Sequence, residues 1–447
     1  MIGNGTSNRG RWLTRSALGI ALAMGVVATG TLTPTPAVAA KKNKAPKMSF
    51  SKAFVAVAGP AQTAIDGLDA NDAAAVASAK GLLDQAFAAI EVEDDRFMAG
   101  TLAVSLGGKL NDPQMQRKGL KAMLASGKAD PASVPRFNSI VGQLAYQAGD
   151  YGEAIQYIET AKTAGFADDS SDAILAEAYI ANNQATKGLG ILKASLAQKA
   201  ASGEAAPEAW YRRGLAAAYK AGMVGEASDF GTMLVQGYPT SKNVGLAATI
   251  IREAGAFSSQ ETLDLMRLMG RTNSYNEERD YVEYIEAADP RRLPGEVLQV
   301  INAGIASGKL NSSGVFVADA KSQASGRLSA DKAGLDSYAR DAAKPSANEA
   351  TVSGAADALL SYGRAAEAEA LYTAALTKAG VDRERTLTRL GIAQFDQGKL
   401  AAAQQTFAKV TGKRASIAKL WAAYAAAKAN TAPVTNPAAA AAETAGS

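Results

Sequence analysis

Short amphipathic segments separated by small turns run along most of the chain. Within a segment, apolar residues recur three or four positions apart, as at Val297, Val300 and Ile301, which is the spacing of one face of an α-helix. Asp112 followed by Pro113 is typical of the cap and first residue of such a helix. The pattern therefore predicts an all-α protein built from short helices that follow one another closely.

The helical segments repeat with a period of about 34 residues. Near-consecutive copies lie at 142–195, a third lies at 210–231, and two more lie at 352–410. In these copies small residues of the first helix allow a neighbouring helix to approach, and large residues of the second helix fill the gap. The small residues are Gly142, Gly214 and Gly391, and the large ones are Ile158, Tyr372 and Phe407.

This arrangement of glycine, alanine and aromatic positions resembles the tetratricopeptide repeat (TPR) family. The resemblance implies a right-handed superhelical solenoid of antiparallel helix pairs, in which stacking buries the apolar face that one pair cannot bury alone. It is clearest in two predicted repeat segments, 131–238 and 351–430. Residues 239–350 are expected to form degenerate TPR-like repeats, and residues 51–130 form helix pairs that match weakly.

The N-terminal 39 residues are predicted to be a secretory signal peptide. Three arginines precede an apolar stretch at 17–28, and small residues at 37–40 supply an A-x-A cleavage site. The apolar stretch is shorter than the roughly 20 residues that a transmembrane helix needs. An uncleaved membrane anchor is the alternative. We therefore expect Sec-type export to the periplasm, with an association with the outer membrane left open, and no transmembrane segment in the mature chain.

The segments that flank the repeat array differ from it in composition. Residues 40–50 are predicted to be a basic linker that contains four lysines, and residues 431–447 a disordered tail rich in alanine and proline. The formal net charge of +4 falls to +1 without the three arginines of residues 1–39. A mature chain near neutrality gives no electrostatic indication of nucleic-acid binding.

Composition also removes the commonest catalytic chemistries. The 447 residues include no cysteine and no histidine. Disulfides, thiolate nucleophiles, imidazole bases and imidazole metal ligands are therefore all absent from the chain. We predict that the protein is not an enzyme and that it has no catalytic residue, cofactor or metal site.

Two kinds of motif have a functional and a structural interpretation. Ser49 with Lys52, and Ser416 with Lys419, match the S-x-x-K of penicillin-binding enzymes, but the K-T-G and S-D-N elements are missing. The acidic runs at 91–95 and 168–172 contain calcium-type oxygen ligands but lack a loop glycine and alternating spacing. Acidic residues there fit better in the first turn of a helix, where they favour the helix dipole.

Partner-binding residues are expected on the inner helices of the array, because the resemblance implies that these helices line a concave groove. Aromatic and arginine side chains are frequent anchors of protein interfaces. The candidates are Arg136, Gln143, Tyr146, Glu177, Tyr211, Arg212, Arg213 and Tyr219. A core position between helix pairs is the alternative for Tyr219 and the favoured one for Trp210.

The predicted function is that of an exported, non-catalytic TPR scaffold. It would mediate protein–protein interaction in the bacterial cell envelope through its concave helical surface. The alternative is an accessory or regulatory subunit of a cell-wall or exopolysaccharide biosynthesis, export or outer-membrane assembly system. Whether the groove takes a peptide, a helix or a glycan stays open at this point.

Overall fold

The computed structural model describes residues 48–166 and 168–431. The predicted signal peptide, most of the predicted linker and nearly all of the predicted tail lie outside these residues. The described residues form helices and turns without a strand, which confirms the predicted all-α fold. They fall into two compact units, unit 1 up to Ala178 and unit 2 from Tyr179 onward.

Six helices precede the unit boundary, and a seventh contains it. In chain order they are α1 (Lys52–Asp66), α2 (Ala73–Ala88), α3 (Glu93–Lys109), α4 (Pro113–Ala125), α5 (Val134–Ala148), α6 (Tyr151–Thr163) and α7 (Asp169–Ala181).

Unit 2 continues with thirteen α-helices and one short 3-10 helix. They are α8 (Ala185–Ala201), α9 (Glu208–Lys220), α10 (Val224–Gly237), α11 (Ser241–Gly255), α12 (Ser259–Arg271), α13 (Glu278–Ala288), α14 (Pro294–Ala306), α15 (Val315–Ala342), α16 (Glu349–Ser361), α17 (Ala365–Ala375), α18 (Arg383–Asp396), α19 (Leu400–Phe407), η1 (Gly412–Arg414) and α20 (Ala415–Thr431).

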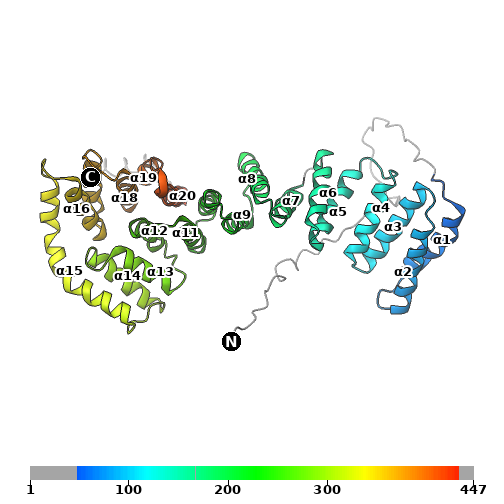
Figure 1. Cartoon of the computed structure of the whole chain (residues 1–447), viewed down its shortest axis with the longest axis horizontal. Coiled ribbons are helices and arrows are strands. Elements are labelled where there is room, and N and C mark those ends of the chain that lie inside the picture. Colours follow the sequence, from blue (N-terminus) through cyan, green and yellow to red (C-terminus); the bar gives the residue numbers. More distant parts are fainter. Residues whose placement is uncertain (1–47, 167, 432–447) are drawn as a thin grey trace, which may run out of the picture. The chain divides into compact units, whose positions relative to one another are not determined.

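Consecutive helices are joined by short turns and pack side by side, so they form antiparallel pairs such as α3–α4, α5–α6 and α9–α10 (Figure 1). Asp112 caps α4 through its side chain, which accepts the Gln114 and Met115 amides, and Pro113 is the first helical residue. The acidic pair Asp94 and Asp95 lies in the first turn of α3, as the helix-dipole interpretation predicts.

The packing between paired helices follows the predicted small-to-large rule. Gly142 faces Ile158, Gly214 faces Phe230 and Gly391 faces Phe407, and each large residue lies 16 positions after its glycine. A Cβ atom added to Gly391 would lie 2.5 Å from the Phe407 ring. The absence of a side chain is thus what allows the first helix to lie against the second.

A matched pair of substitutions tests this rule in unit 1. Gly142→Ala is expected to lower the free energy of unfolding by about 1–3 kcal/mol, because its Cβ would press on Ile158 and lie 3.1 Å from the Ala154 carbonyl. Gly152→Ala, on α6, meets nothing within 4 Å and is expected to stabilise the helix by about 0.5–1 kcal/mol. Urea unfolding followed by circular dichroism measures both. Equal effects would contradict the rule.

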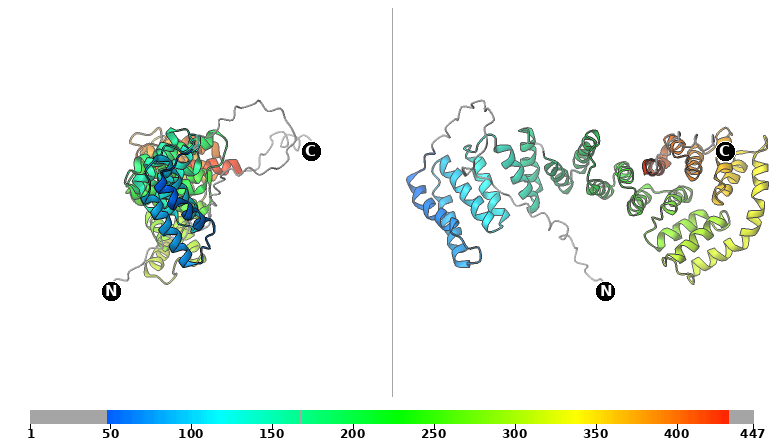
Figure 2. Two further views of the ribbon diagram at one scale, coloured as in Figure 1. Left: turned by 90° about the vertical axis from the view of Figure 1, so that its right-hand side faces the viewer. Right: turned by 180° about the vertical axis from the view of Figure 1, so that it is seen from behind.

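The succession of helices in unit 2 turns far enough for its last helices to return to α10, α11 and α12. The last helix, α20, packs against α10 and α19 and also touches α11 and α12, while α18 contacts α12. The long helix α15 connects the two sides of this closed arrangement (Figures 1 and 2). The repeat pattern predicts stacking of neighbours but not this contact of α18 and α20 with helices that lie far earlier in the chain.

Candidate functional site

The predicted partner-binding residues divide between the two units. Arg136, Gln143 and Tyr146 lie on α5 and Glu177 lies on α7, all within unit 1. The remaining four lie on α9 in unit 2. Each set is a local surface of its own unit.

The residues of α5 and α7 form a ladder of polar contacts between two first helices of successive pairs. The Ser139 and Ser171 hydroxyls lie 2.7 Å apart, and both atoms are buried. The Gln143 amide donates to Ser139 at 3.2 Å, and the Tyr146 hydroxyl donates to the Glu177 carboxylate. The ladder therefore fixes the spacing of α5 and α7 and leaves Gln143, Tyr146 and Glu177 half-buried.

An open pocket of about 400 Å³ lies between α3 and α5, the helix that also carries Gln143 and Tyr146 of the ladder. Pockets of roughly 300–1,000 Å³ that combine apolar walls with a few polar groups are the usual places for ligands. Its lining comes from α3, α4, α5 and the preceding loop, and consists of Phe97, Met98, Thr101, Val104, Met123, Asp130, Ser133, Arg136, Phe137 and Ile140. One of the sequence-predicted residues, Arg136, is thus part of the wall.

Local sequence explains why this pocket is open and apolar. Thr101 lies one helical turn after Phe97 and Met98 on one face of α3, and Ile140 lies one turn after Phe137 on α5. Phe97, Phe137 and Ile140 are only partly buried, against a core of Val104, Leu120, Met123, Val141 and Leu144. The apolar face of the two helices is therefore wider than their shared core can cover.

The α9 residues are engaged in contacts within unit 2. The Tyr211 ring packs edge-on to Tyr238, with ring centroids 6.0 Å apart. Arg212 pairs with Glu208 at 2.6 Å. The Tyr219 hydroxyl donates to Glu253 at 2.7 Å, and this bond raises the pKa of Tyr219. Arg213 is exposed.

Trp210 is buried in the core, as its favoured interpretation states, and Tyr219 is 41% exposed, so it is not a core filler.

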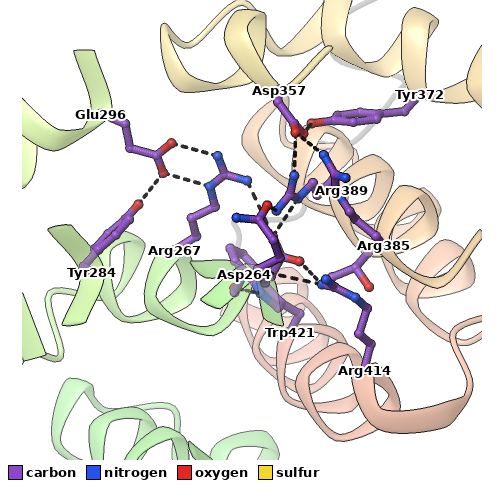
Figure 3. A network of polar contacts seen from close by, with 12 residues as sticks. Asp264, Arg267, Tyr284, Glu296, Asp357, Tyr372, Arg385, Arg389, Arg414 and Trp421 are labelled. Atoms are coloured by element: carbon purple, nitrogen blue, oxygen red, sulfur yellow. Dashed lines mark hydrogen bonds and ion pairs between the residues drawn. The ribbon is translucent and has the colours of Figure 1, made fainter. Parts of the chain in front are cut away.

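Sequence reasoning missed a buried network of charged residues where unit 2 closes. We call it the charged hub, and Figure 3 shows it. It joins α12, α14, α16, α18 and η1 through Asp264, Arg267, Glu296, Asp357, Arg385, Arg389 and Arg414. Asp264, Arg267 and Arg389 are each 0% exposed.

Arg389 and Arg267 satisfy the buried carboxylates of the hub. Arg389 donates from Nε to Asp264 at 2.9 Å and from Nη1 to Asp357 at 2.6 Å. Arg267 binds Glu296 with two nitrogens, at 2.8 and 2.7 Å. Bidentate pairs of this kind are among the strongest charge-assisted hydrogen bonds. The hub therefore fastens helices that are more than a hundred residues apart in the chain.

Neighbouring aromatic residues complete the hub. The Tyr284 hydroxyl donates to Glu296 at 2.6 Å, and that of Tyr372 donates to Asp357 at 2.7 Å. Burial alone would raise the pKa of both carboxyls, but the facing arginines, Arg267 for Glu296 and Arg389 for Asp357, keep both below their usual values. Both carboxylates are ionised at neutral pH and already bound by arginine and tyrosine side chains, so the hub is suited to holding helices together.

In the S-x-x-K motif at Ser416 and in the acidic run at 91–95, the side chains make contacts that hold neighbouring segments of the chain in place. Ser416 donates to the Lys413 carbonyl at 3.4 Å, whereas Lys419 pairs with Asp229 at 3.2 Å, so each member of this S-x-x-K motif has a different partner. Asp94 accepts the Ser49 amide at 2.7 Å, and this bond lowers the pKa of its carboxyl. Within residues 48–166 and 168–431, no three acidic side chains gather in a way that would hold a metal ion.

No helix within residues 48–166 and 168–431 combines the length and the apolar character needed to cross a membrane.

Comparison with known proteins gives no match to a protein-family profile and none to a curated protein. Among solved structures, the chain is similar to the TPR2AB domain of yeast Sti1 in complex with pHSP90. The identity is 15% and the TM-score 0.24, over 66% of this chain and 99% of that one.

Two further solved structures are similar at the same low level. The maize pentatricopeptide repeat protein PPR10 is 14% identical with a TM-score of 0.29, over 89% of this chain and 64% of that one. The human IFIT1 dimer with PPP-AAAA is 14% identical with a TM-score of 0.20, over 87% and 96%. The TPR-like construction of the chain is evident in its own helix pairs, where a glycine of the first helix faces a large residue of the second.

Proposed function

We propose that this protein is an exported, non-catalytic scaffold whose unit 1 binds a segment of another protein of the bacterial cell envelope. The observation that carries the proposal is the pocket between α3 and α5. An apolar pocket whose wall also holds a guanidinium, a carboxylate and two hydroxyls suits a peptide, which offers both a side chain and a polar backbone. The export and envelope parts of the proposal rest on the signal peptide predicted for residues 1–39.

The chemistry of the described residues supports binding over catalysis. The carboxylates of the charged hub are ion-paired and buried, which leaves them poorly suited to proton transfer. The pocket, by contrast, is lined mainly by apolar side chains, with one guanidinium, one carboxylate and two hydroxyls. Large contact area with a few oriented polar groups is how preformed helical surfaces recognise partners.

A site-specific photo-crosslinker tests this proposal in the full chain. Phe97 is replaced by p-benzoylphenylalanine, which keeps an aromatic ring in the pocket wall. Irradiation in cells is expected to give one defined adduct, with the crosslink mapping to a single segment of the partner. The same substitution at Gln156, an exposed residue of α6, is the control and is expected to give no such adduct.

A second variant links the adduct to the pocket itself. Ile140→Asp places a charge in the apolar wall and is expected to abolish crosslinking from position 97, while circular dichroism confirms that the helices remain. Failure to crosslink from position 97, or equal adducts from positions 97 and 156, would overturn the proposal for this pocket.

A further inference from the structure

We infer that the pocket of unit 1 selects a segment in which a large apolar residue stands next to an aspartate or glutamate. This inference rests on the proposed function and names the class of ligand. The apolar residue would enter the pocket, and the acidic residue would face Arg136 at its rim. The two halves of the inference rest on separate observations, namely the lining of the pocket and the charge balance of unit 1.

The lining supports the apolar half. Six of the ten lining residues are apolar, and they come from three helices: Phe97, Met98 and Val104 from α3, Met123 from α4, and Phe137 and Ile140 from α5. Methionine adapts to irregular shapes, and aromatic rings offer large rigid contact area. A volume of about 400 Å³ accommodates a leucine, methionine or phenylalanine side chain with part of its backbone. A small residue such as alanine would leave the wall uncovered.

The charge balance supports the acidic half. Unit 1 has three arginines among its described residues, and two of them are neutralised within the unit. Arg96 pairs with Glu93 at 3.0 Å, and Arg117 pairs with Asp150 at 2.5 Å. Arg136 lies in the pocket wall, is exposed, and forms no ion pair with any described residue. It is therefore the one arginine of described unit 1 whose guanidinium is available to a partner.

Other charges near the pocket do not cancel this preference. The Asp130 carboxylate lies in the same wall and is held within its own turn, where it accepts the amide of Ala132 at 3.1 Å. It keeps its negative charge but forms no ion pair with Arg136 among the described contacts, so the guanidinium stays open to a second carboxylate. Lys128, close to Asp130 in sequence, pairs with Asp94 at 3.0 Å. Arg136 also lies in the first turn of α5, where the helix dipole favours a negative partner. A carboxylate placed there meets both the guanidinium and the positive end of the helix.

The test uses three short fluorescent peptides that differ at two adjacent positions, Leu-Glu, Leu-Lys and Ala-Glu. Fluorescence anisotropy with the full chain is expected to show that the Leu-Glu peptide binds about tenfold or more tightly than either of the others. The preference for Glu over Lys is expected to weaken at high salt, because an exposed ion pair is screened.

A charge reversal makes the test decisive. Arg136→Glu is expected to invert the order, so that the Leu-Lys peptide binds more tightly than the Leu-Glu peptide. Arg96→Glu makes the same change of charge on α3, outside the pocket, and is expected to leave the order unchanged. Circular dichroism of both variants checks that the helices are intact.

Each outcome bears on one half of the inference. Equal binding of the Leu-Glu and Leu-Lys peptides, or an order that Arg136→Glu leaves unchanged, would overturn the acidic half. Equal binding of the Leu-Glu and Ala-Glu peptides would overturn the apolar half. If no peptide binds while crosslinking from position 97 still maps to the pocket, the ligand class is wrong and the proposed function stands. If the crosslinking also fails, both are wrong.

Discussion

Replacing Asp264 by alanine is expected to lower the free energy of unfolding of unit 2 by about 3–5 kcal/mol, because it leaves buried guanidinium groups without their carboxylate. Asp264 is 0% exposed and accepts from Arg389 at 2.9 Å and from Arg414. In the variant, these two arginines and Arg267 would share the remaining acids of the charged hub. Removal of one member of a buried ion network costs more than the network contributes net, since the partners stay desolvated.

Urea unfolding together with hydrogen exchange measured by mass spectrometry checks this expectation in the full chain. Faster exchange is expected in α12, α18 and α20 together, although these helices are far apart in sequence. Asp341→Ala is the control, because Asp341 forms an exposed pair with Lys344 at 2.6 Å, and its exchange pattern is expected to stay that of the wild type. Unchanged protection of α12 and α18 in Asp264→Ala would show that the hub does not hold unit 2 closed.

Replacing Trp421 by alanine is expected to lower the free energy of unfolding of unit 2 by about 3–5 kcal/mol, because packing contacts in the core are lost. Trp421 is 0% exposed, stacks on Phe407 with centroids 5.8 Å apart, and packs edge-on to Phe395 at 5.2 Å. Its indole nitrogen donates to the Asp264 carbonyl at 2.9 Å. The side chain therefore connects α20 to both α18–α19 and α12.

Hydrogen exchange in helices far from Trp421 in the sequence shows whether the side chain holds unit 2 closed. Trp421→Ala is expected to raise the exchange rate in α10, against which α20 packs, as well as in α20 itself. Trp421→Phe keeps an aromatic ring but loses the hydrogen bond to the Asp264 carbonyl. It is expected to lower the free energy of unfolding by about 1–2 kcal/mol. If α20 loses protection while α10 keeps it, the closure of unit 2 depends on contacts other than this side chain.

The sequence predicted helix positions, a helix cap and a contact between paired helices, because each depends on residues close together in the chain. Helix positions follow from apolar spacing, and the cap at Asp112 follows from the chemistry of an Asp-Pro step. The contact between Gly142 and Ile158 follows from a repeat period that places a residue without a side chain opposite a large one. These features depend on residues close together in the chain, so a pattern of spacing contains them.

The candidate site could be predicted only in part. The resemblance to TPR proteins placed Arg136, Gln143, Tyr146 and Glu177 on inner helices. The structure brings the last three into one ladder and places Arg136, which shares α5 with two of them, in the pocket wall. It also placed Arg212 and Tyr219 among partner-binding residues, and the structure shows both engaged with glutamates of unit 2. Their role toward a partner stays a prediction. The pocket residues Phe97 and Met98 were missed, because an apolar residue on a helix gives the same signal whether its neighbour covers it or not.

By itself, the sequence determined that this chain is all-α, that its helices pair, and which small and large residues meet within a pair. Only the tertiary structure decided that Asp264 and Arg389, 125 positions apart, are bonded in a buried hub. The run of apolar residues around Asp264 and Arg267, from Leu263 to Met269, was the one available signal, since charges within such a run need a buried partner. That signal does not name the partner, because the angle between successive pairs accumulates over many helices and determines which distant residues meet.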